Sequence, residues 1–558
     1  MTPVTNVKSP ASLVRWLPGG WTLGAIAIAV AIATPVLVVG ANLFADTGEI
    51  WQHLASTVLP LYLRNSLGLS AGVGLGVFII GTATAWLVTL CQFRGQRFFE
   101  WALLLPLSAP AYVLAYAYTD LLEAGGPVQT AIRNLTGLRF GEYWFPNVRS
   151  LPGAIAMLTL VLYPYVYLLA RVAFMEQSTC TLEASRSLGC NPWKSFFKVA
   201  LPLARPAIVA GLSLALMEAL NDFGTVEYFG VPTFTTGIYR TWFGMGERIA
   251  ASQLASILLL FIFVLIWLEQ WSRARAKYYQ STSRYRTLSR YQLQGVREGC
   301  AIAACVLPIF FGFLLPGGVL LHMTLNNWNQ TIDRRFWGFA TNSFILASVT
   351  AILGVVLAVI LAYGVRLQPN LGMRLATRIS AMGYAIPGAV IAVGILIPVG
   401  RFDNAIDRWM QATFGVSTGL LLSGTIVALV FAYLVRFLAV SFSTVEASLV
   451  KIKPNLDEAA RSLGTSPTQT LIRVHAPMMW GGLLTGGMLV FVDVMKELPA
   501  TLIIRPFNFD TLAVRAYQLA ADERLIRASG PSLAIVLVGL IPVILLSWKI
   551  AQSRDYES

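Results

Sequence analysis

The chain has 558 residues, of which 56% are hydrophobic and only 12% are charged. A soluble protein of this length carries about 25% charged residues, so the composition excludes an ordinary soluble domain. Its apolar runs are continuous and lack the period-two alternation of a membrane barrel, which leaves a helical membrane protein. The net charge of +14 is typical of basic cytoplasmic loops, so we expect no nucleic-acid partner.

We predict an all-α polytopic protein with about twelve transmembrane helices in a lipid bilayer. The expected spans, in chain order, lie near residues 21–41, 62–90, 100–119, 152–174, 204–221, 252–271, 299–321, 341–365, 376–399, 417–440, 479–494 and 529–549. Polar tails at 1–20 and 551–558 and a basic linker at 273–298 divide the chain into halves at 21–272 and 299–550. Lys and Arg gather on the side of the N-terminal tail, which places both termini and the linker in the cytoplasm.

One polar stretch occurs twice, about half the chain apart, and we call its copies the first corner (residues 183–202) and the second corner (residues 458–477). The copies begin Glu-Ala-Ser-Arg-Ser-Leu-Gly and Glu-Ala-Ala-Arg-Ser-Leu-Gly, and each reaches a proline at equal spacing. Asn65-Ser66 and Pro110 of the first half likewise match Asn342-Ser343 and Pro387 of the second. Six spans in each half give both halves one orientation, so we expect two parallel six-helix repeats.

The chemistry of each corner predicts two short helices joined by a sharp turn. Gly189 and Gly464 can end the first helix in the left-handed conformation. Pro192 and Pro467 then suit the first position of the next helix, and the residue before each proline, Asn or Ser, is a good cap. The alternative is an amphipathic hairpin lying on the membrane. The apolar side chains that could dock on a partner are Leu188, Trp193, Phe196, Phe197, Leu463, Leu471 and Ile472.

This pattern resembles the coupling motif of bacterial ABC importer permeases. The matching positions are Glu183, Ala184, Gly189, Pro192 and Pro202 in the first corner, and Glu458, Ala459, Gly464, Pro467 and Pro477 in the second. Two permease domains fused in one chain resemble the ferric iron permeases, and the fused thiamine permeases are similar in layout. The resemblance covers core domains at about 60–270 and 338–548. It implies a type I importer permease fold, with the corners inserted into two cytoplasmic ATP-binding subunits.

The same resemblance implies a periplasmic substrate-binding protein as a partner and the bacterial inner membrane as the location. The sequence contains no Gly-Lys dipeptide, so it has no phosphate-binding loop of the GxxxxGK[ST] type. We therefore expect ATP and Mg²⁺ to act on the partner subunits. We expect this chain to bind no cofactor and to have no catalytic site of its own.

Two pairs of acidic residues lie at equivalent positions near the ends of two spans. Glu218 and Asp222 are four residues apart, as are Asp493 and Glu497, so each pair faces one side of a helix. Acids within a membrane are costly and commonly functional, and ferric ions prefer hard oxygen ligands, so the four could line a pathway for iron. The alternative is that they form gating ion pairs, for example with Lys496, or cap helix ends.

No firm metal site is indicated elsewhere. His53, His322 and His475 are scattered along the chain, and the five cysteines contain no CxxC pair. Two other functions remain open: a permease for thiamine or another small solute, and a secondary transporter of the twelve-span type. A secondary transporter has no need for two cytoplasmic corners, so the sequence favours an importer whose cargo is ferric iron.

Overall fold

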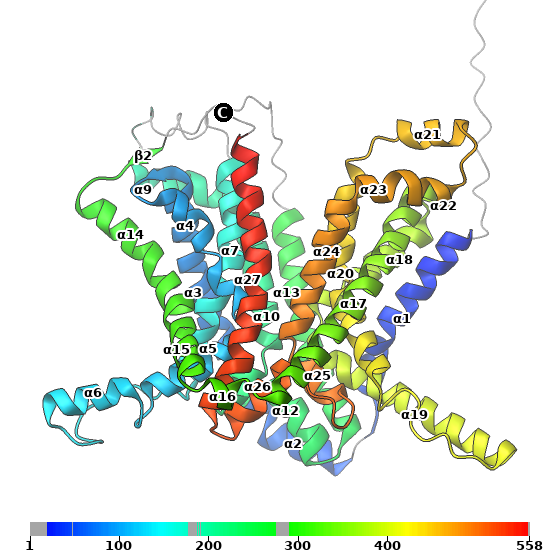
Figure 1. Cartoon of the computed structure of the whole chain (residues 1–558), viewed down its shortest axis with the longest axis horizontal. Helices are drawn as coiled ribbons and strands as arrows, with labels where there is room; N and C mark the ends of the chain where they lie inside the picture. The colour runs from blue at the N-terminus through cyan, green and yellow to red at the C-terminus, as the bar shows by residue number, and fades with distance from the viewer. Residues whose placement is uncertain are drawn as a thin grey trace, which may run out of the picture.

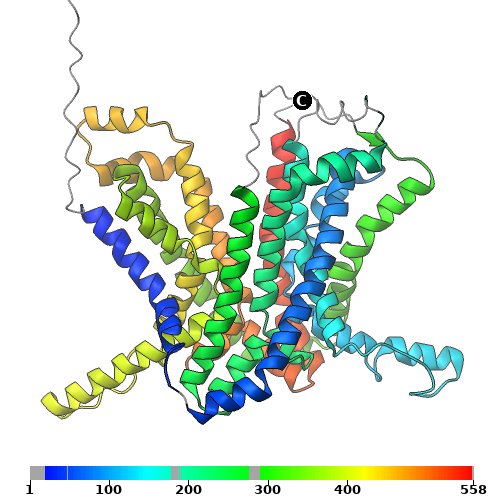
Figure 2. The ribbon, with the colours of Figure 1, turned by 180° about the vertical axis from the view of Figure 1, so that it is seen from behind.

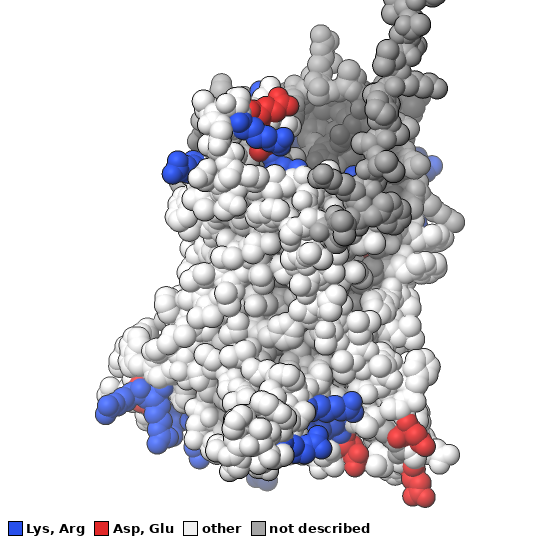
Figure 3. Space-filling model, turned by 90° about the vertical axis from the view of Figure 1, so that its right-hand side faces the viewer, with Lys and Arg blue, Asp and Glu red and all other residues white. Residues whose placement is uncertain are grey.

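The computed structural model describes residues 19–46, 48–176, 187, 189, 191–274 and 290–555. Within these residues lie 10 helices long and apolar enough to cross a membrane, or up to 12 if each of two bent helix pairs is counted as one span. The predicted all-α polytopic architecture is therefore confirmed. In the side view of Figure 3, a belt of uncharged surface separates charged residues gathered at the two ends of the molecule.

The first half supplies the elements up to α13. Its helices, helical turns and short strand are α1 (Gly20–Asn42), α2 (Glu49–Thr57), α3 (Leu59–Leu90), β1 (Cys91–Gln92), α4 (Gln96–Ala102), η1 (Leu105–Ser108), α5 (Ala111–Leu122), α6 (Pro127–Thr136), α7 (Leu151–Glu176), α9 (Pro192–Ser195), η2 (Phe196–Ala200), α10 (Leu201–Asn221), α11 (Gly224–Tyr228), α12 (Phe234–Tyr239), η3 (Arg240–Gly244) and α13 (Arg248–Ala274).

The last residues of the predicted linker form a strand that pairs with β1, in parallel. The elements of this linker end and of the second half are β2 (Tyr291–Gln292), α14 (Val296–Ile309), η4 (Phe310–Leu314), α15 (Leu315–Asn326), α16 (Trp328–Thr331), α17 (Arg334–Leu367), α18 (Leu371–Ser380), η5 (Gly383–Ala385), α19 (Gly388–Phe414), α20 (Ile426–Val450), α21 (Asn455–Ser462), α22 (Pro467–Thr470), η6 (Leu471–His475), α23 (Ala476–Met478), α24 (Trp480–Lys496), α25 (Pro499–Ile504), α26 (Leu512–Ala521) and α27 (Leu525–Asp555).

Two of the predicted spans are broken where continuous helices were expected. The span predicted at 100–119 consists of α4, η1 and α5, and the span at 376–399 consists of α18, η5 and the start of α19. Each break falls immediately before Pro110 or Pro387, where the preceding residue is extended. Proline lacks an N–H and disfavours helical geometry in the residue before it, so it starts a new helix here. Helix α20 also begins at Ile426, later than the predicted start at 417.

Both corners lie at the same end of the helix bundle, on opposite sides of it, and we call this end the corner end. Figures 1 and 2 place α9, α21–α23, the start of α1 and the last turns of α27 at this end. The opposite end carries α2, α6, α12 and α26. This arrangement matches an even number of crossings in each half, as the parallel repeat requires. The tails at 1–18 and 556–558 and the linker at 275–289 lie outside the described residues.

The first span of each half packs against the other half. Helix α1 lies against α18 and α19 of the second half, where Thr22 donates a hydrogen bond to Gln368 Oε1 at 2.8 Å. In return, α14, η4 and α15 pack on α3, α5 and α7 of the first half. Tyr118 there donates to the carbonyl of Phe311 at 2.6 Å. The two halves are therefore interlocked by exchanged helices.

Equivalent contacts in the two halves show that the repeat seen in the sequence is also present in the structure. Asn65 donates from Nδ2 to the carbonyl of Pro232 at 2.9 Å, and Asn342 donates in the same way to Asp510 at 3.1 Å. The serine after each asparagine accepts a hydrogen bond from the backbone of the same loop. The matched Asn-Ser pairs thus fix one loop at the opposite end of each half.

Candidate functional site

The second corner adopts the turn predicted from its sequence. Helix α21 contains Glu458 and ends before Gly464, whose φ of 77° lies in the left-handed region. Ser466 then caps α22, with a reciprocal bond from Gln469, and Pro467 occupies the first turn. The glycine is needed because a side chain in this conformation is strained. The predicted order of helix, glycine, cap and proline is confirmed here.

Polar contacts fasten the second corner to the end of α17. Arg366 pairs with Asp457 of α21 at 2.6 Å and also donates to the carbonyl of Ile452 at 3.0 Å. Tyr363 donates its hydroxyl to the carbonyl of Pro467 at 2.8 Å. His475, which is fully buried, lies with Nε2 3.1 Å from Asp457 Oδ1. The chain then bends by 79° between the segment that contains Pro477 and α24, so the anchored corner leads directly into a span.

The described part of the first corner follows the same path. Gly189 has a φ of 79°, Asn191 Oδ1 accepts a hydrogen bond from the N–H of Lys194 at 2.8 Å, and α9 begins at Pro192. Pro202 lies in the first turn of α10. The predicted coupling residues Glu183 and Ala184, together with Leu188, lie outside the described residues.

Aromatic rings lie beneath the described part of the first corner. Phe196 is buried and lies 4.8 Å, between ring centroids, from Trp86 at the end of α3. Trp86 also contacts Phe174 of α7 at 5.7 Å and Tyr291 of β2 at 6.3 Å. The end of the linker between the halves therefore helps to hold the first corner.

The surface that the corners offer to a partner is smaller than the sequence suggested. Phe196 and its counterpart Leu471 are each only 9% exposed, because they face the bundle. Among the predicted docking residues that the structure describes, the exposed side chains are Trp193, Phe197, Leu463 and Ile472.

The four predicted acids meet in one cavity between the halves. Glu218 lies in the last turn of α10 and Asp493 in the last turn of α24, and Asp222 and Glu497 directly follow these helices. All four line a cavity of about 120 Å³. Its walls come from α5, α7, α10 and α11 of the first half and from α20, α24 and α25 of the second.

Two of these acids cap the short helices that follow them. Asp222 accepts hydrogen bonds from the N–H groups of Thr225 and Val226 at 3.0 and 3.1 Å. Glu497 accepts from the N–H groups of Ala500 and Thr501 at 2.9 and 3.0 Å. Each also accepts from the hydroxyl of the threonine in its cap. These oxygens satisfy the free donors at helix starts, as the capping alternative requires.

The other two acids are paired with cations of the second half. Lys496 lies 2.9 Å from Asp493, the ion pair named in the sequence analysis. Arg436 of α20 was missed there, although it interrupts the apolar run of the tenth predicted span. It lies 3.7 Å from Glu218 and 3.2 Å from Glu497, and only 6% of its side chain is exposed. A charge within a span is itself a sign of function, and it is the signal that could have identified Arg436.

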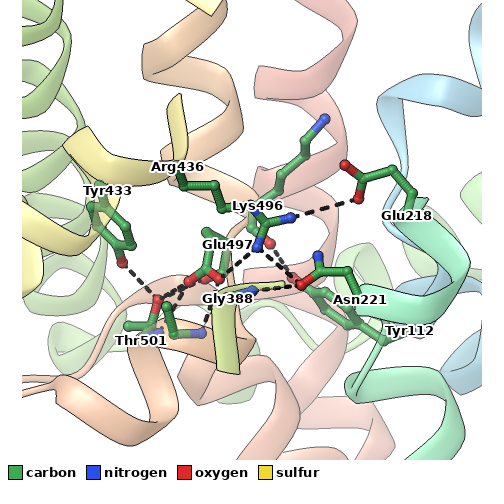
Figure 4. A network of polar contacts seen from close by, with 10 residues as sticks. Tyr112, Glu218, Asn221, Gly388, Tyr433, Arg436, Lys496, Glu497 and Thr501 are labelled. Carbon is green, nitrogen blue, oxygen red and sulfur yellow. Dashed lines mark hydrogen bonds and ion pairs between the residues drawn. The ribbon is translucent and has the colours of Figure 1, made fainter. Parts of the chain in front are cut away.

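Figure 4 shows how these side chains tie the halves together. Asn221 of the first half accepts hydrogen bonds at Oδ1 from the N–H of Gly388 at 2.7 Å and from Arg436 at 3.4 Å. Tyr112 of the first half donates to the carbonyl of Lys496 at 3.3 Å. We call the set Glu218, Asn221, Arg436, Asp493, Lys496 and Glu497 the inter-half cluster.

The inter-half cluster holds the two halves together. Its ion pairs and hydrogen bonds join α10 to α20, and they must separate if the halves move apart. Among the described residues, no group of three or more His, Cys, Asp and Glu side chains could hold a metal ion. The acids here are satisfied by cations and helix starts and do not form a metal cage.

Comparison with known proteins gives one family match in both halves. The family described as binding-protein-dependent transport system inner membrane component matches residues 22–278 and 354–551. This match in two repeats confirms the predicted type I ABC importer permease fold.

Curated relatives extend along most of the chain. It is 26% identical to an Fe(3+)-transport system permease protein of Haemophilus influenzae, over 87% of this chain and 89% of the relative. It is 23% identical to a ferric transport system permease protein of Actinobacillus pleuropneumoniae, over 94% of this chain and 77% of the relative. A molybdenum transport system permease protein of Escherichia coli is 28% identical over 41% of this chain. The chain therefore belongs to the inner membrane components of binding-protein-dependent transport systems.

Proposed function

We propose that this chain is the permease of an ATP-driven importer that moves ferric iron from a periplasmic binding protein to the cytoplasm. The observation that carries the proposal is the pair of repeated corners at one end of the bundle, each leading into a span that ends at the inter-half cluster. Relatives that match most of the chain are named as ferric permeases, which favours iron as the cargo.

Each corner is the expected receiver for one of two cytoplasmic ATP-binding subunits. ATP and Mg²⁺ bind to those subunits, and this chain contributes no cofactor site. The corner end then faces the cytoplasm, with both termini and the linker on that side of a bacterial inner membrane. The excess of Lys and Arg on the predicted inside segments supports this orientation.

The inter-half cluster is the expected gate between the halves. Motion of the corners passes along α10 and α24, which follow the two corners and carry Glu218 and Asp493 in their last turns. When these helices move apart, Arg436 of the second half must leave Glu218 and Asn221 of the first. Glu218 and Asp493 use their carboxylates for cations and not for caps, so they are the two acids that a passing ferric ion could contact.

Two alternatives are weaker. The match to a molybdenum permease covers less than half of this chain, so an oxyanion or another small solute such as thiamine is the second choice of cargo. Membership of a binding-protein-dependent family speaks against the secondary transporter.

The test uses vesicles that contain the permease, its ATP-binding subunits and its binding protein. We expect ATP-dependent uptake of radiolabelled ferric iron, and no uptake of labelled molybdate or thiamine. Uptake of either competitor without iron would overturn the assignment of the cargo. The double variant Glu218→Gln, Asp493→Asn then separates the roles of the acids: normal uptake with normal ATP coupling would show that neither acid is needed for passage or gating.

A further inference from the structure

Each half carries a lateral extension at the end opposite the corners. The first wing is α6 with its return loop (residues 127–150), and the second wing is the outer part of α19 with its return loop (residues 401–425). Figures 1 and 2 show α6 and α19 projecting from the bundle in opposite directions. Neither wing contributes to the cavity or to the corners, so the proposed function leaves them unexplained.

Hydrogen bonds hold the return loop of the second wing against its helix. Asp403 accepts a hydrogen bond from the N–H of Ser423 at 2.8 Å, and Asp407 accepts one from the N–H of Thr418 at 2.7 Å. These two acids are four residues apart, so they share one face of the helix. The return loop is therefore fastened along that face, and the remaining faces of the outer helix point away from it.

Those remaining faces differ in chemistry. Phe402 and Trp409 are seven residues apart and are 52% and 59% exposed, so they form one apolar face. Arg401 and Arg408 each precede one of these rings by one residue, and both are exposed. Successive residues are about 100° apart around a helix, so a basic face lies beside the apolar face. This combination is typical of a helix that lies in the interface of a bilayer.

The first wing repeats the chemistry with other residues. Tyr143 of its return loop donates to Gln129 Oε1 of α6 at 2.8 Å, which fastens the loop to the helix. Leu135 and Trp144 are each 87% exposed, and Arg139 lies exposed between them in the sequence. Both wings thus present apolar side chains together with arginine, at the level where the long apolar helices end.

We propose that the two wings lie in the headgroup layer of the leaflet at this end. Trp409 and Trp144 reach toward the acyl chains, and Arg401 and Arg408 pair with the phosphates of anionic phospholipids. Position and charge argue for lipid as the occupant: the wings leave the bundle sideways, where a bilayer surrounds a membrane protein, and arginine complements an anionic headgroup. The inference depends on the membrane location and not on the cargo.

The depth of Trp409 can be measured in the full chain reconstituted in phosphatidylglycerol-containing vesicles. The difference between the fluorescence of the unchanged chain and that of Trp409→Phe isolates this ring from the other tryptophans. We expect strong quenching by lipids brominated near the headgroup end of the acyl chain and weak quenching by aqueous iodide. Iodide quenching as strong in vesicles as in detergent, and relieved by adding the binding protein, would overturn the proposal and assign the surface to that protein.

The preference for anionic lipid is tested by the double variant Arg401→Gln, Arg408→Gln. We expect this variant to retain phosphatidylglycerol less well than the unchanged chain does, with binding weakened about fivefold for each arginine removed. The matched control Arg461→Gln, Arg473→Gln removes the same charge from exposed positions in the second corner, and we expect it to keep phosphatidylglycerol bound at the wings. Equal lipid retention by the wing variant and the unchanged chain would contradict the proposal, and the Trp409 measurement shows whether the wing is still folded in place.

Discussion

The two corners share a backbone path but are held by different chemistry. Gly189 and Gly464 have φ values of 79° and 77°, and a capped helix that begins at proline follows each of them. Beneath the described part of the first corner lie aromatic rings in edge-to-face contact, whereas an Arg366–Asp457 ion pair fastens the second. The turn is common to both because both must present a bent protrusion, but the anchor differs from one half to the other.

The inter-half cluster shows the same contrast. Helices α7 and α20 are equivalent, and Val161 lies as far into α7 as Arg436 lies into α20. Both residues line the cavity, as do Asn221 and its counterpart Lys496. The cations that line the cavity thus come from the second half. The ion pair across the halves therefore depends on a cation that only the second half supplies. A structural two-fold relation therefore does not imply equal roles, and variants can separate them.

The largest expected effect is at Arg436, where one side chain serves both halves. Arg436→Met leaves Glu218 and Glu497 without their cation, and removing one partner of a buried ion pair costs about 3–5 kcal/mol. We expect a lower unfolding temperature, and we expect the reconstituted complex to hydrolyse ATP without the binding protein. Thermal unfolding and an ATPase assay measure the two effects.

Arg171→Met is the matched control for this variant. Arg171 pairs with Glu100 at 3.2 Å within the first half, and both side chains are almost completely buried. We expect a similar loss of stability with ATP hydrolysis still dependent on the binding protein. If both variants uncouple ATP hydrolysis equally, the gate function of the inter-half cluster is wrong.

A smaller effect is expected when the anchor of the second corner is removed. Asp457→Asn deprives Arg366 of its ionic partner, and a hydrogen bond to a charged group contributes about 1.5–3 kcal/mol. We expect faster hydrogen exchange in α21 and weaker binding of the ATP-binding subunit. The counterpart is Phe196→Leu, which removes ring contacts and should increase exchange at the described part of the first corner alone. Increased exchange at both corners in either variant would show that the anchors are not independent.

The pH dependence of the second corner follows from His475. Burial lowers the pKa of His475 below its ordinary value, while Asp457 acts to raise it and Arg366 to lower it. The unfolded state then binds the proton more readily, so the stability is fully present above a pH of about 6.5 and decreases as the pH falls through the folded pKa. We expect exchange at α21 to rise on acidification, and His475→Gln to reduce this dependence. A rise of the same size in the variant would exclude His475 as the cause.

The smallest expected effect should be equal in the two corners. Gly189→Ala and Gly464→Ala place a side chain in the left-handed region, where it costs about 1 kcal/mol or somewhat more. Apart from the chain neighbours of each glycine, no atom of the described residues lies within 4 Å of the added carbon, so the cost comes from the backbone. Thermal unfolding should show similar losses, and Gly338→Ala in the helical part of α17 should show none. Clearly unequal losses would mean that the anchors also set the turn.

Local chemistry allowed the turns and spans to be predicted, because glycine, caps, proline and apolar length act over a few residues. The predicted helix starts at Pro192 and Pro467 are confirmed for that reason. The breaks at Pro110 and Pro387 were missed although both prolines had been matched between the halves, because each predicted span was treated as uniform. The division into domains at 21–272 and 299–550 stays a prediction.

Long-range partners could not be predicted in the same way. The acids Glu218 and Asp493 were identified because charges are rare in spans. That these two pair with cations, whereas the other two acids cap helices, depends on how two distant helix ends meet. Arg436 carried the same signal and was overlooked among apolar neighbours. The exchange of α1 and α14–α15 leaves no mark in composition or spacing, because every span is apolar whichever half it contacts.

The exchanged first helix has a consequence for how the chain is made. Thr22 of α1 and its partner Gln368 are 346 residues apart. At a synthesis rate of about 5–20 residues per second, α1 enters the bilayer roughly 20–70 seconds before its partners in the second half exist. During that interval α1 can pack on α13 of its own half, but the side that later contacts α18 and α19 faces lipid. The packing of α1 is therefore completed only after α18 and α19 of the second half have been synthesised, and this order of events favours carrying both halves on one polypeptide.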